Sequence, residues 1–239
     1  PVPPHFNSMQ SRSPPATDLL RDASADAAGP LAKRLRPASL HDIVGQPHLI
    51  GPEGTLTRML QRDTLASLVL WGPPGVGKTT IARLLAAESN LHFVGLSAVF
   101  SGVADLRRVF EEAGRRRQAG QRTLLFVDEV HRFNRAQQDG FLGVVEDGTV
   151  VLVGATTENP SFALNGALLS RCQVLVLRRL DDAALETLLT RAEAAARRAL
   201  PLTPDARATL RAMADGDGRY VLNMAEQLLA VADGQVLDA

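Results

Sequence analysis

Apolar residues gather into five short runs along the chain, separated by stretches in which apolar positions recur with helical spacing. The runs lie at residues 67–71, 92–96, 123–127, 150–155 and 173–177. Each run is apolar at nearly every position, which is typical of strands that are covered on both faces. The pattern therefore predicts a parallel five-stranded sheet wrapped by helices, an α/β fold in three layers.

The spacing of apolar residues between the runs predicts helices over 77–88, 104–119 and 134–146. No further strand is predicted after Leu180, where helical patterns cover 181–198, 204–214 and 219–232. Asp181 and Thr203 precede two of these patterns and are residue types that cap helices. We therefore expect an α/β domain over residues 31–178 and a small all-α lid domain over 179–239.

Residues 1–30 contain several prolines with scattered Ser, Asp and Ala, and they lack apolar periodicity. This composition predicts a disordered tail. An expression-tag remnant ahead of Met9 is one possible origin of residues 1–8, so the fold prediction does not use them.

Composition narrows the possible functions. The 26 basic and 26 acidic residues cancel, so any surface for nucleic acid has to be local. Aromatic residues make up 4% of the chain, which argues against a protein that stacks single-stranded bases on aromatic rings. A single cysteine, Cys172, and the lack of any apolar run long enough for a bilayer predict a cytoplasmic protein without a membrane segment.

The turn after the first predicted strand has the pattern of a phosphate-binding loop. Residues 72–79 read Gly-Pro-Pro-Gly-Val-Gly-Lys-Thr, which matches the Walker A motif. Backbone N–H groups of such a loop surround phosphate oxygens at the N-terminus of the next helix. Lys78, one of only two lysines, would neutralise the β- and γ-phosphates of ATP, and Thr79 would ligate Mg²⁺. The predicted nucleotide-binding residues here are Gly72, Pro73, Pro74, Gly75, Val76, Gly77, Lys78, Thr79 and Thr80.

Two acidic residues, Asp128 and Glu129, follow the third predicted strand. The carboxyl edge of a parallel sheet is where open α/β folds bind ligands. We expect Asp128 to hold Mg²⁺ and Glu129 to orient or deprotonate the attacking water. His131 is interpreted as a structural or coupling residue, because the five histidines are dispersed and no cysteine cluster suggests zinc.

Three further positions are candidates for sensing or completing the site. Thr157 follows the fourth predicted strand, where a hydroxyl would hold water or the γ-phosphate; a plain threonine-rich turn is the alternative. Arg171 precedes the last strand and would act as an arginine finger on a neighbouring subunit's nucleotide. Arg219 opens a lid helix and would close over the nucleotide. For both arginines, an exposed structural role is the alternative.

The order of these motifs along the chain resembles that of the AAA+ ATPases of the clamp-loader clade. The motifs are the phosphate loop, Asp128 with Glu129, Thr157, Arg171 and Arg219. Residues 35–37 and 42–46 resemble the adenine-side segment of that clade, which implies that Val44 and Gly45 bind nucleotide. Residues 126–139 and 154–162 resemble a narrower group, the replication-associated recombination protein A (MgsA) family, bacterial relatives of the Werner-helicase-interacting ATPase.

The resemblance implies a DNA-dependent ATPase of replication forks and recombination in the bacterial cytoplasm, associated with the nucleoid. It implies DNA forks, ends and single-strand/double-strand junctions as ligands, and single-strand-binding protein as a partner. It also implies a homo-oligomer, a tetramer in the full-length protein, assembled through a C-terminal domain that we expect to be absent from residues 1–239.

Other functions remain open at this point. A clamp-loader subunit and a Holliday-junction branch-migration motor belong to the same superfamily, and a nucleotide-gated scaffold without catalysis is a different class. Arginines that would serve as DNA contacts cluster in and after the helix predicted at 104–119, and a solvated helix end, with arginines that complement its dipole, is the alternative that the pattern favours. They are Arg107, Arg108, Arg115, Arg116, Arg117 and Arg122.

Overall fold

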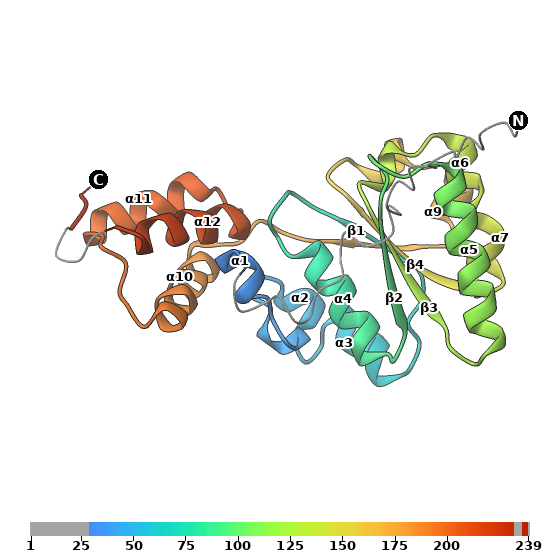
Figure 1. Ribbon diagram of the computed structural model, residues 1–239, viewed down its shortest axis with the longest axis horizontal. Helices are drawn as coiled ribbons and strands as arrows, with labels where there is room; N and C mark the ends of the chain where they lie inside the picture. The colour runs from blue at the N-terminus through green and yellow to red at the C-terminus, as the bar shows by residue number, and fades with distance from the viewer. Residues whose placement is uncertain (1–28, 232–235, 239) are drawn as a thin grey trace, which may run out of the picture.

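The computed structural model of the chain describes residues 29–231 and 236–238. The predicted disordered tail lies outside the described residues, apart from residues 29 and 30. Strands and helices alternate as far as residue 176, and three helices follow at one end of the molecule (Figure 1).

The five strands form one parallel sheet in the order β2-β3-β4-β1-β5. β1 therefore lies inside the sheet, where Leu68 pairs with Val153 on one side and with Gln173 on the other. The predicted parallel five-stranded sheet is confirmed. The strands are β1 (Leu68–Trp71), β2 (His92–Ser97), β3 (Thr123–Asp128), β4 (Val150–Thr156) and β5 (Gln173–Val176).

Helices cover both faces of the sheet, as the sequence predicted (Figure 1). On one side are η1 (Leu40–Asp42), α2 (Pro47–Ile50), α3 (Thr55–Gln61) and α4 (Lys78–Glu88). On the other are α5 (Val103–Gln118), η2 (Val130–Arg132), α6 (Arg135–Asp139), α7 (Phe141–Glu146), α8 (Pro160–Ala163) and α9 (Gly166–Leu169). Within the described residues, no helix is both long and apolar enough to cross a lipid bilayer.

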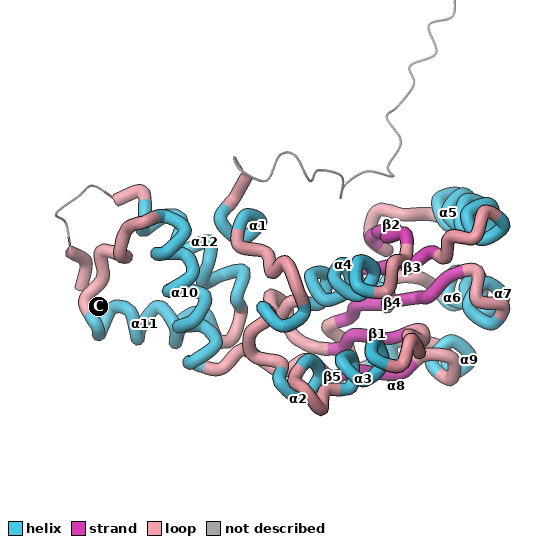
Figure 2. Tube along the Cα trace, turned by 90° about the horizontal axis from the view of Figure 1, so that it is seen from below, coloured by secondary structure: helices cyan, strands magenta, loops and turns pink. Residues whose placement is uncertain are grey.

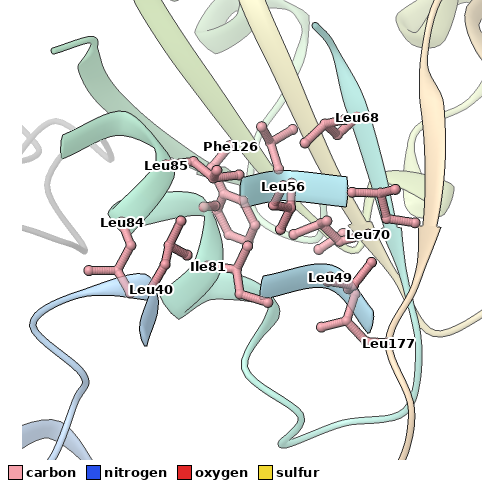
Figure 3. Close-up of a cluster of buried hydrophobic side chains, with 14 of the residues drawn as sticks. Leu40, Leu49, Leu56, Leu68, Leu70, Ile81, Leu84, Leu85, Phe126 and Leu177 are labelled. Atoms are coloured by element: carbon pink, nitrogen blue, oxygen red, sulfur yellow. The ribbon is translucent and has the colours of Figure 1, made fainter. Parts of the chain in front are cut away.

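Alternation along the strands divides the sheet's side chains between two cores. In β3, Leu124 and Phe126 point toward α4, whereas Leu125 and Val127 point toward α5. Figure 3 shows the first core, in which Phe126 lies among leucines contributed by β1, α3 and α4. The continuous apolar runs of the sequence reflect this burial on both faces.

The structure departs from the sequence expectations in three respects. The helix predicted over 134–146 is two helices, α6 and α7, which meet at Gly140. The short helices α2, α3, α8 and α9 were not predicted, because four to seven residues are too few to establish a helical period. In β5, Val174 and Val176 are exposed, because this strand forms an edge of the sheet.

The lid consists of α10 (Asp182–Ala196), α11 (Pro204–Ala214) and α12 (Gly218–Leu229). The predicted caps are confirmed, since the Asp181 and Thr203 side chains accept hydrogen bonds from Ala184 and Ala206 N–H. These helices form a third core, which also contains Leu31 of α1 (Leu31–Arg34). Figures 1 and 2 both show the three helices beside α1 and apart from the sheet.

A buried glutamine fixes the connection between the sheet and the lid. Gln46, fully buried, donates from Nε2 to the Arg178 carbonyl at 2.8 Å and accepts at Oε1 from the Arg178 N–H at 3.0 Å. Both backbone groups of Arg178 are therefore satisfied by one side chain from a distant segment. Residues 177–181 leave β5 and enter α10, so Gln46 sets where that linker starts.

Replacing this side chain should destabilise the fold. Gln46→Leu removes both hydrogen bonds to Arg178 at similar volume, and we expect a loss of about 2 kcal/mol in the free energy of unfolding. Urea unfolding of residues 1–239 measures it, with exposed Gln118→Leu as the matched control. A Gln46→Leu midpoint equal to that of Gln118→Leu would show that the two bonds contribute nothing to stability.

Candidate nucleotide site

The loop between β1 and α4 curls where its glycines allow it. Gly75 and Gly77 have φ values of 69° and 98°, in the left-handed region that favours glycine. α4 begins at Lys78, directly after this curl. The loop thus presents backbone N–H groups at a helix N-terminus, the geometry that binds phosphate oxygens.

Lys78 lies inside this loop and is 8% exposed. Its Nζ donates to the carbonyl oxygens of Gly72 and Pro73, at 2.7 Å each. Burial lowers the pKa of Lys78 from its ordinary value, while the negative charges of Glu129 and Asp128 act in the opposite direction. The ammonium is therefore held by carbonyls and faces two carboxylates.

A cavity of about 390 Å³ opens beside the loop, between the sheet and the lid. One part of its wall is apolar and comes from the N-terminal segment and the lid: Leu35, Ile43, Val44, Leu180, Leu188 and Leu222. The other part carries the predicted polar residues: Lys78, Thr79, Asp128, Glu129, Thr157 and Arg219. A flat apolar base and a charged phosphate chain would find matching walls in one cavity.

Most predicted nucleotide-binding residues line this cavity, and three do not. Residues 74–80 and Val44 line it, whereas Gly72, Pro73 and Gly45 lie behind the wall. Gly72 and Pro73 supply the carbonyls that hold Lys78. Gly45 has a φ of 77°, and a Cβ there would lie 2.4 Å from Leu180 Cδ2, so this glycine allows the segment to pack on the linker.

Adjacent threonines at the tip of β4 play different roles. Thr157 is exposed and lines the cavity. Thr156 is fully buried, and its Oγ1 lies 2.9 Å from His131 Nδ1. His131 Nδ1 is also 3.2 Å from Glu129 Oε2, and its Nε2 is 3.4 Å from Glu158 Oε1. The tips of β3 and β4 are therefore joined through one imidazole.

The lid touches the phosphate loop directly. The Gly218 N–H donates to the Gly75 carbonyl at 3.2 Å. Asp217 caps α12 by accepting from the N–H groups of Arg219 and Tyr220. Its carboxylate also packs on Gly75, where an added Cβ would lie 1.7 Å from Oδ1. The start of α12, which carries Arg219 into the cavity wall, is thus seated on the loop.

Arg171 lies outside the cavity of its own chain. It donates from Nη1 to the Ala167 carbonyl at 2.7 Å, and its Nη2 pairs with Glu146 of α7. The structure therefore does not bring Arg171 together with Lys78, Glu129 and Arg219.

The arginines on and after α5 include paired and exposed side chains, and Arg117 is both. Arg108 pairs with Asp105 and Arg116 with Glu112 on the same helix, while Arg117 reaches Asp147 and Thr149. The exposed ones are Arg107, Arg115, Arg117 and Arg122. Part of the predicted basic stretch thus supports the helix and its neighbours.

Sequence reasoning missed several residues that shape the site. The lid's Leu188 and Leu222 follow ordinary helical periodicity, so nothing local distinguished them from core leucines. Asp217 and Gln46 act through pairings across the fold, which a single sequence does not encode locally.

The chain is similar in sequence and in fold to known proteins. The model of the ATPase family associated with various cellular activities (AAA) matches residues 68–180. Replication-associated recombination protein A of Escherichia coli is 44% identical over 91% of this chain, which covers 50% of that protein. ATPase WRNIP1 of Dictyostelium discoideum is 43% identical over 84% of this chain and is covered to 23%. The chain thus spans about half the length of the first relative and less of the second.

The fold also matches a solved structure. The Thermotoga maritima RuvB Holliday junction branch migration motor aligns with a TM-score of 0.66 and 25% identity, covering 80% of this chain and 64% of that one. The AAA+ fold and the similarity to the recombination protein A family that the motifs indicated are both confirmed.

The contact between Gly75 and the lid predicts unequal effects of two alanine substitutions. Gly77→Ala adds only left-handed strain, about 1 kcal/mol, because nothing lies within 4 Å of its new Cβ. Gly75→Ala should cost about 1 kcal/mol more, since it also displaces the Asp217 carboxylate from its cap. Urea unfolding of both variants measures the difference.

A double variant separates the two contributions. Asp217→Gly removes the carboxylate and keeps a residue that is tolerated at an N-cap. In the Asp217→Gly background, Gly75→Ala should therefore lower the free energy of unfolding by only as much as Gly77→Ala does in the parent. Equal losses for the two single variants would rule out the lid contact as a source of stability.

Proposed function

The chain belongs to the AAA family of ATPases through residues 68–180, and on that basis we propose that it hydrolyses ATP to ADP and phosphate in the service of DNA replication and recombination. One observation carries the proposal: a single cavity gathers the phosphate loop, the acidic pair of β3, the tip of β4 and a lid arginine. Each of these groups supplies a separate element of the machinery that transfers a phosphoryl group to water.

The cavity suggests how ATP would lie. The base and ribose fit the apolar wall formed by Val44, Leu180 and Leu222, and the phosphates follow the loop to the N-terminus of α4. Lys78 would exchange its two carbonyl partners for β- and γ-phosphate oxygens. The bonds from the ammonium to phosphate oxygens are charge-assisted on both sides, so they offset the loss of the two bonds to the backbone carbonyls.

The polar wall also fits Mg²⁺. Thr79 and Asp128 offer a hydroxyl and a carboxylate oxygen, the hard donors that this ion prefers. When bound, the ion would neutralise charge on the phosphate oxygens. Glu129 would accept a proton from the attacking water, Thr157 would hold that water or the γ-phosphate, and Arg219 would sense the nucleotide from the lid.

Arg171 would complete the site of a neighbouring subunit. It lies outside its own cavity, so a role on the nucleotide requires a second copy of the chain. Its pair with Glu146 is partly exposed and worth no more than about 1 kcal/mol, so a neighbour's phosphate would displace it readily. Activity then depends on assembly into a homo-oligomer, which the family resemblance puts at a tetramer.

DNA forks, ends and single-strand/double-strand junctions are the proposed ligands, with single-strand-binding protein as a partner. The exposed arginines on and after α5 offer phosphate contacts that do not depend on base sequence. The similarity to the RuvB motor favours a second candidate, movement of a DNA junction.

Turnover by the full-length protein tests the proposed reaction. Phosphate release from ATP is measured without DNA and with single strands, duplexes, forks and four-way junctions. Glu129→Gln should keep ATP binding and slow turnover by about a hundredfold, as expected for a lost general base. Lys78→Ala should lose ATP binding. Equal turnover with every DNA, or an active Glu129→Gln protein, would overturn the respective part of the proposal.

Complementation tests the placement of Arg171. Arg171→Ala should leave ATP binding intact and cut turnover by about a thousandfold. A mixture of full-length Arg171→Ala and Glu129→Gln proteins should regain part of the activity, because some interfaces then combine an intact Glu129 with a neighbour's intact Arg171. Mixed assemblies that stay inactive would mean that Arg171 does not act across the interface.

A further inference from the structure

His131 is the group that joins the proposed catalytic carboxylate to the neighbouring strand. It lies in η2, two residues after Glu129, and its side chain is 8% exposed. Within one ring, Nδ1 faces both Glu129 Oε2 at 3.2 Å and Thr156 Oγ1 at 2.9 Å, while Nε2 faces Glu158 Oε1 at 3.4 Å. An imidazole placed in this way can restrain a carboxylate that has to be aimed accurately.

The turn that carries Glu129 and His131 is itself fixed. Glu129 has a φ of 52°, in the left-handed region, so its side chain leaves the strand in a direction that a regular strand end would not give. Val130, between the two residues, is buried against Gly154 of β4, where an added Cβ would lie 3.0 Å from its Cγ1. The backbone around the imidazole therefore has little room to move.

Glu129 needs such a restraint. Among the described residues, its Oε2 is buried and has no partner that meets hydrogen-bond geometry. Nδ1 of His131 lies close enough to become that partner with a small adjustment. A base displaced by about 1 Å from its productive position loses on the order of a hundredfold in rate.

The Thr156 hydroxyl determines whether Nδ1 can donate a hydrogen bond to Glu129. Its hydroxyl lies 2.9 Å from Nδ1 and 3.3 Å from the Glu158 carbonyl, so its proton has two acceptors. With the hydroxyl donating to Nδ1, the imidazole proton is on Nε2 and faces Glu158, and Glu129 has no donor. With the hydroxyl donating to the Glu158 carbonyl, Nδ1–H is free to donate to Glu129.

We propose that His131 is a positioning residue for ATP hydrolysis: its Nδ1–H holds Glu129 toward the attacking water, and the Thr156 hydroxyl decides whether Nδ1 carries that proton. This inference rests on the proposed function, because it concerns what orients Glu129, the proposed general base. Thr157, next to Thr156, lines the cavity. A shift of the β4 tip on nucleotide binding would thus reach Glu129 through the Thr156 hydroxyl and the imidazole.

Two amide substitutions distinguish the ring nitrogens. His131→Asn keeps a polar N–H near the Nδ1 position, whereas His131→Gln places its amide near Nε2 and leaves Glu129 without a donor. In the full-length protein we expect His131→Gln to lower kcat by about tenfold to a hundredfold, with ATP affinity within about twofold of the parent. His131→Asn should recover to within about threefold. Exposed His41→Gln is the matched control and should leave both quantities unchanged.

A double variant separates positioning from a general structural role. In a Glu129→Gln background, His131→Gln should cause no further loss of residual turnover, because the carboxylate that it aims is already gone. A further loss equal to that in the parent would overturn the proposal.

The outcomes also distinguish this inference from the function on which it rests. If Glu129→Gln turns over ATP at the parent rate, the proposed hydrolysis at this site fails. If Glu129→Gln is inactive while both amide variants of His131 match the parent, only the positioning role is overturned. Equal losses of ATP affinity, stability and kcat in His131→Asn and His131→Gln would make the imidazole structural and would also overturn it.

Discussion

The phosphate loop is packed so closely between the end of β5 and the lid that Gly72 and Gly75 leave no room for a side chain. A Cβ on Gly72 would lie 2.5 Å from the Leu177 carbonyl oxygen, and one on Gly75 would overlap the Asp217 carboxylate. Only glycine permits these approaches together with the left-handed φ of Gly75. The seating of α12 on the loop depends on this close packing. The same glycines that let backbone N–H groups face phosphates therefore also bring the lid to the site.

The sequence allowed the fold to be predicted where its signals were local. The five strands, the loop at 72–79 and the caps Asp181 and Thr203 each follow from neighbouring residues. The break at Gly140 was missed because helical spacing continues across it, and Gly140 itself keeps helical dihedrals. The exposure of β5 was missed because strand order is not visible in an apolar run, and only order decides which strand lies at an edge.

The candidate site shows the same division between residues that local motifs reveal and residues that depend on tertiary contacts. Lys78, Thr79, Asp128 and Glu129 follow from short motifs, and the cavity contains all four. The residues that orient them come from distant segments: Gln46 holds the linker, Asp217 lies on Gly75, and His131 reaches Thr156. Such pairs depend on tertiary contacts and have no periodicity. Motifs thus identify the groups that meet the nucleotide, whereas their supports become visible only in the folded chain.

The participation of α1 in the lid core affects how the chain can fold. The Leu31 N–H donates to Glu226 Oε1 of α12 at 2.8 Å, and the Leu31 side chain is buried among the lid helices. The lid core is therefore closed by segments from opposite ends of the described chain. During synthesis, α1 leaves the ribosome long before α12 exists, so its apolar face has no partner while the sheet is forming. Because non-local contacts of this kind form slowly, docking of α1 should be among the last steps of folding. A lid excised from the chain would lack Leu31 and expose the apolar surface that this residue covers.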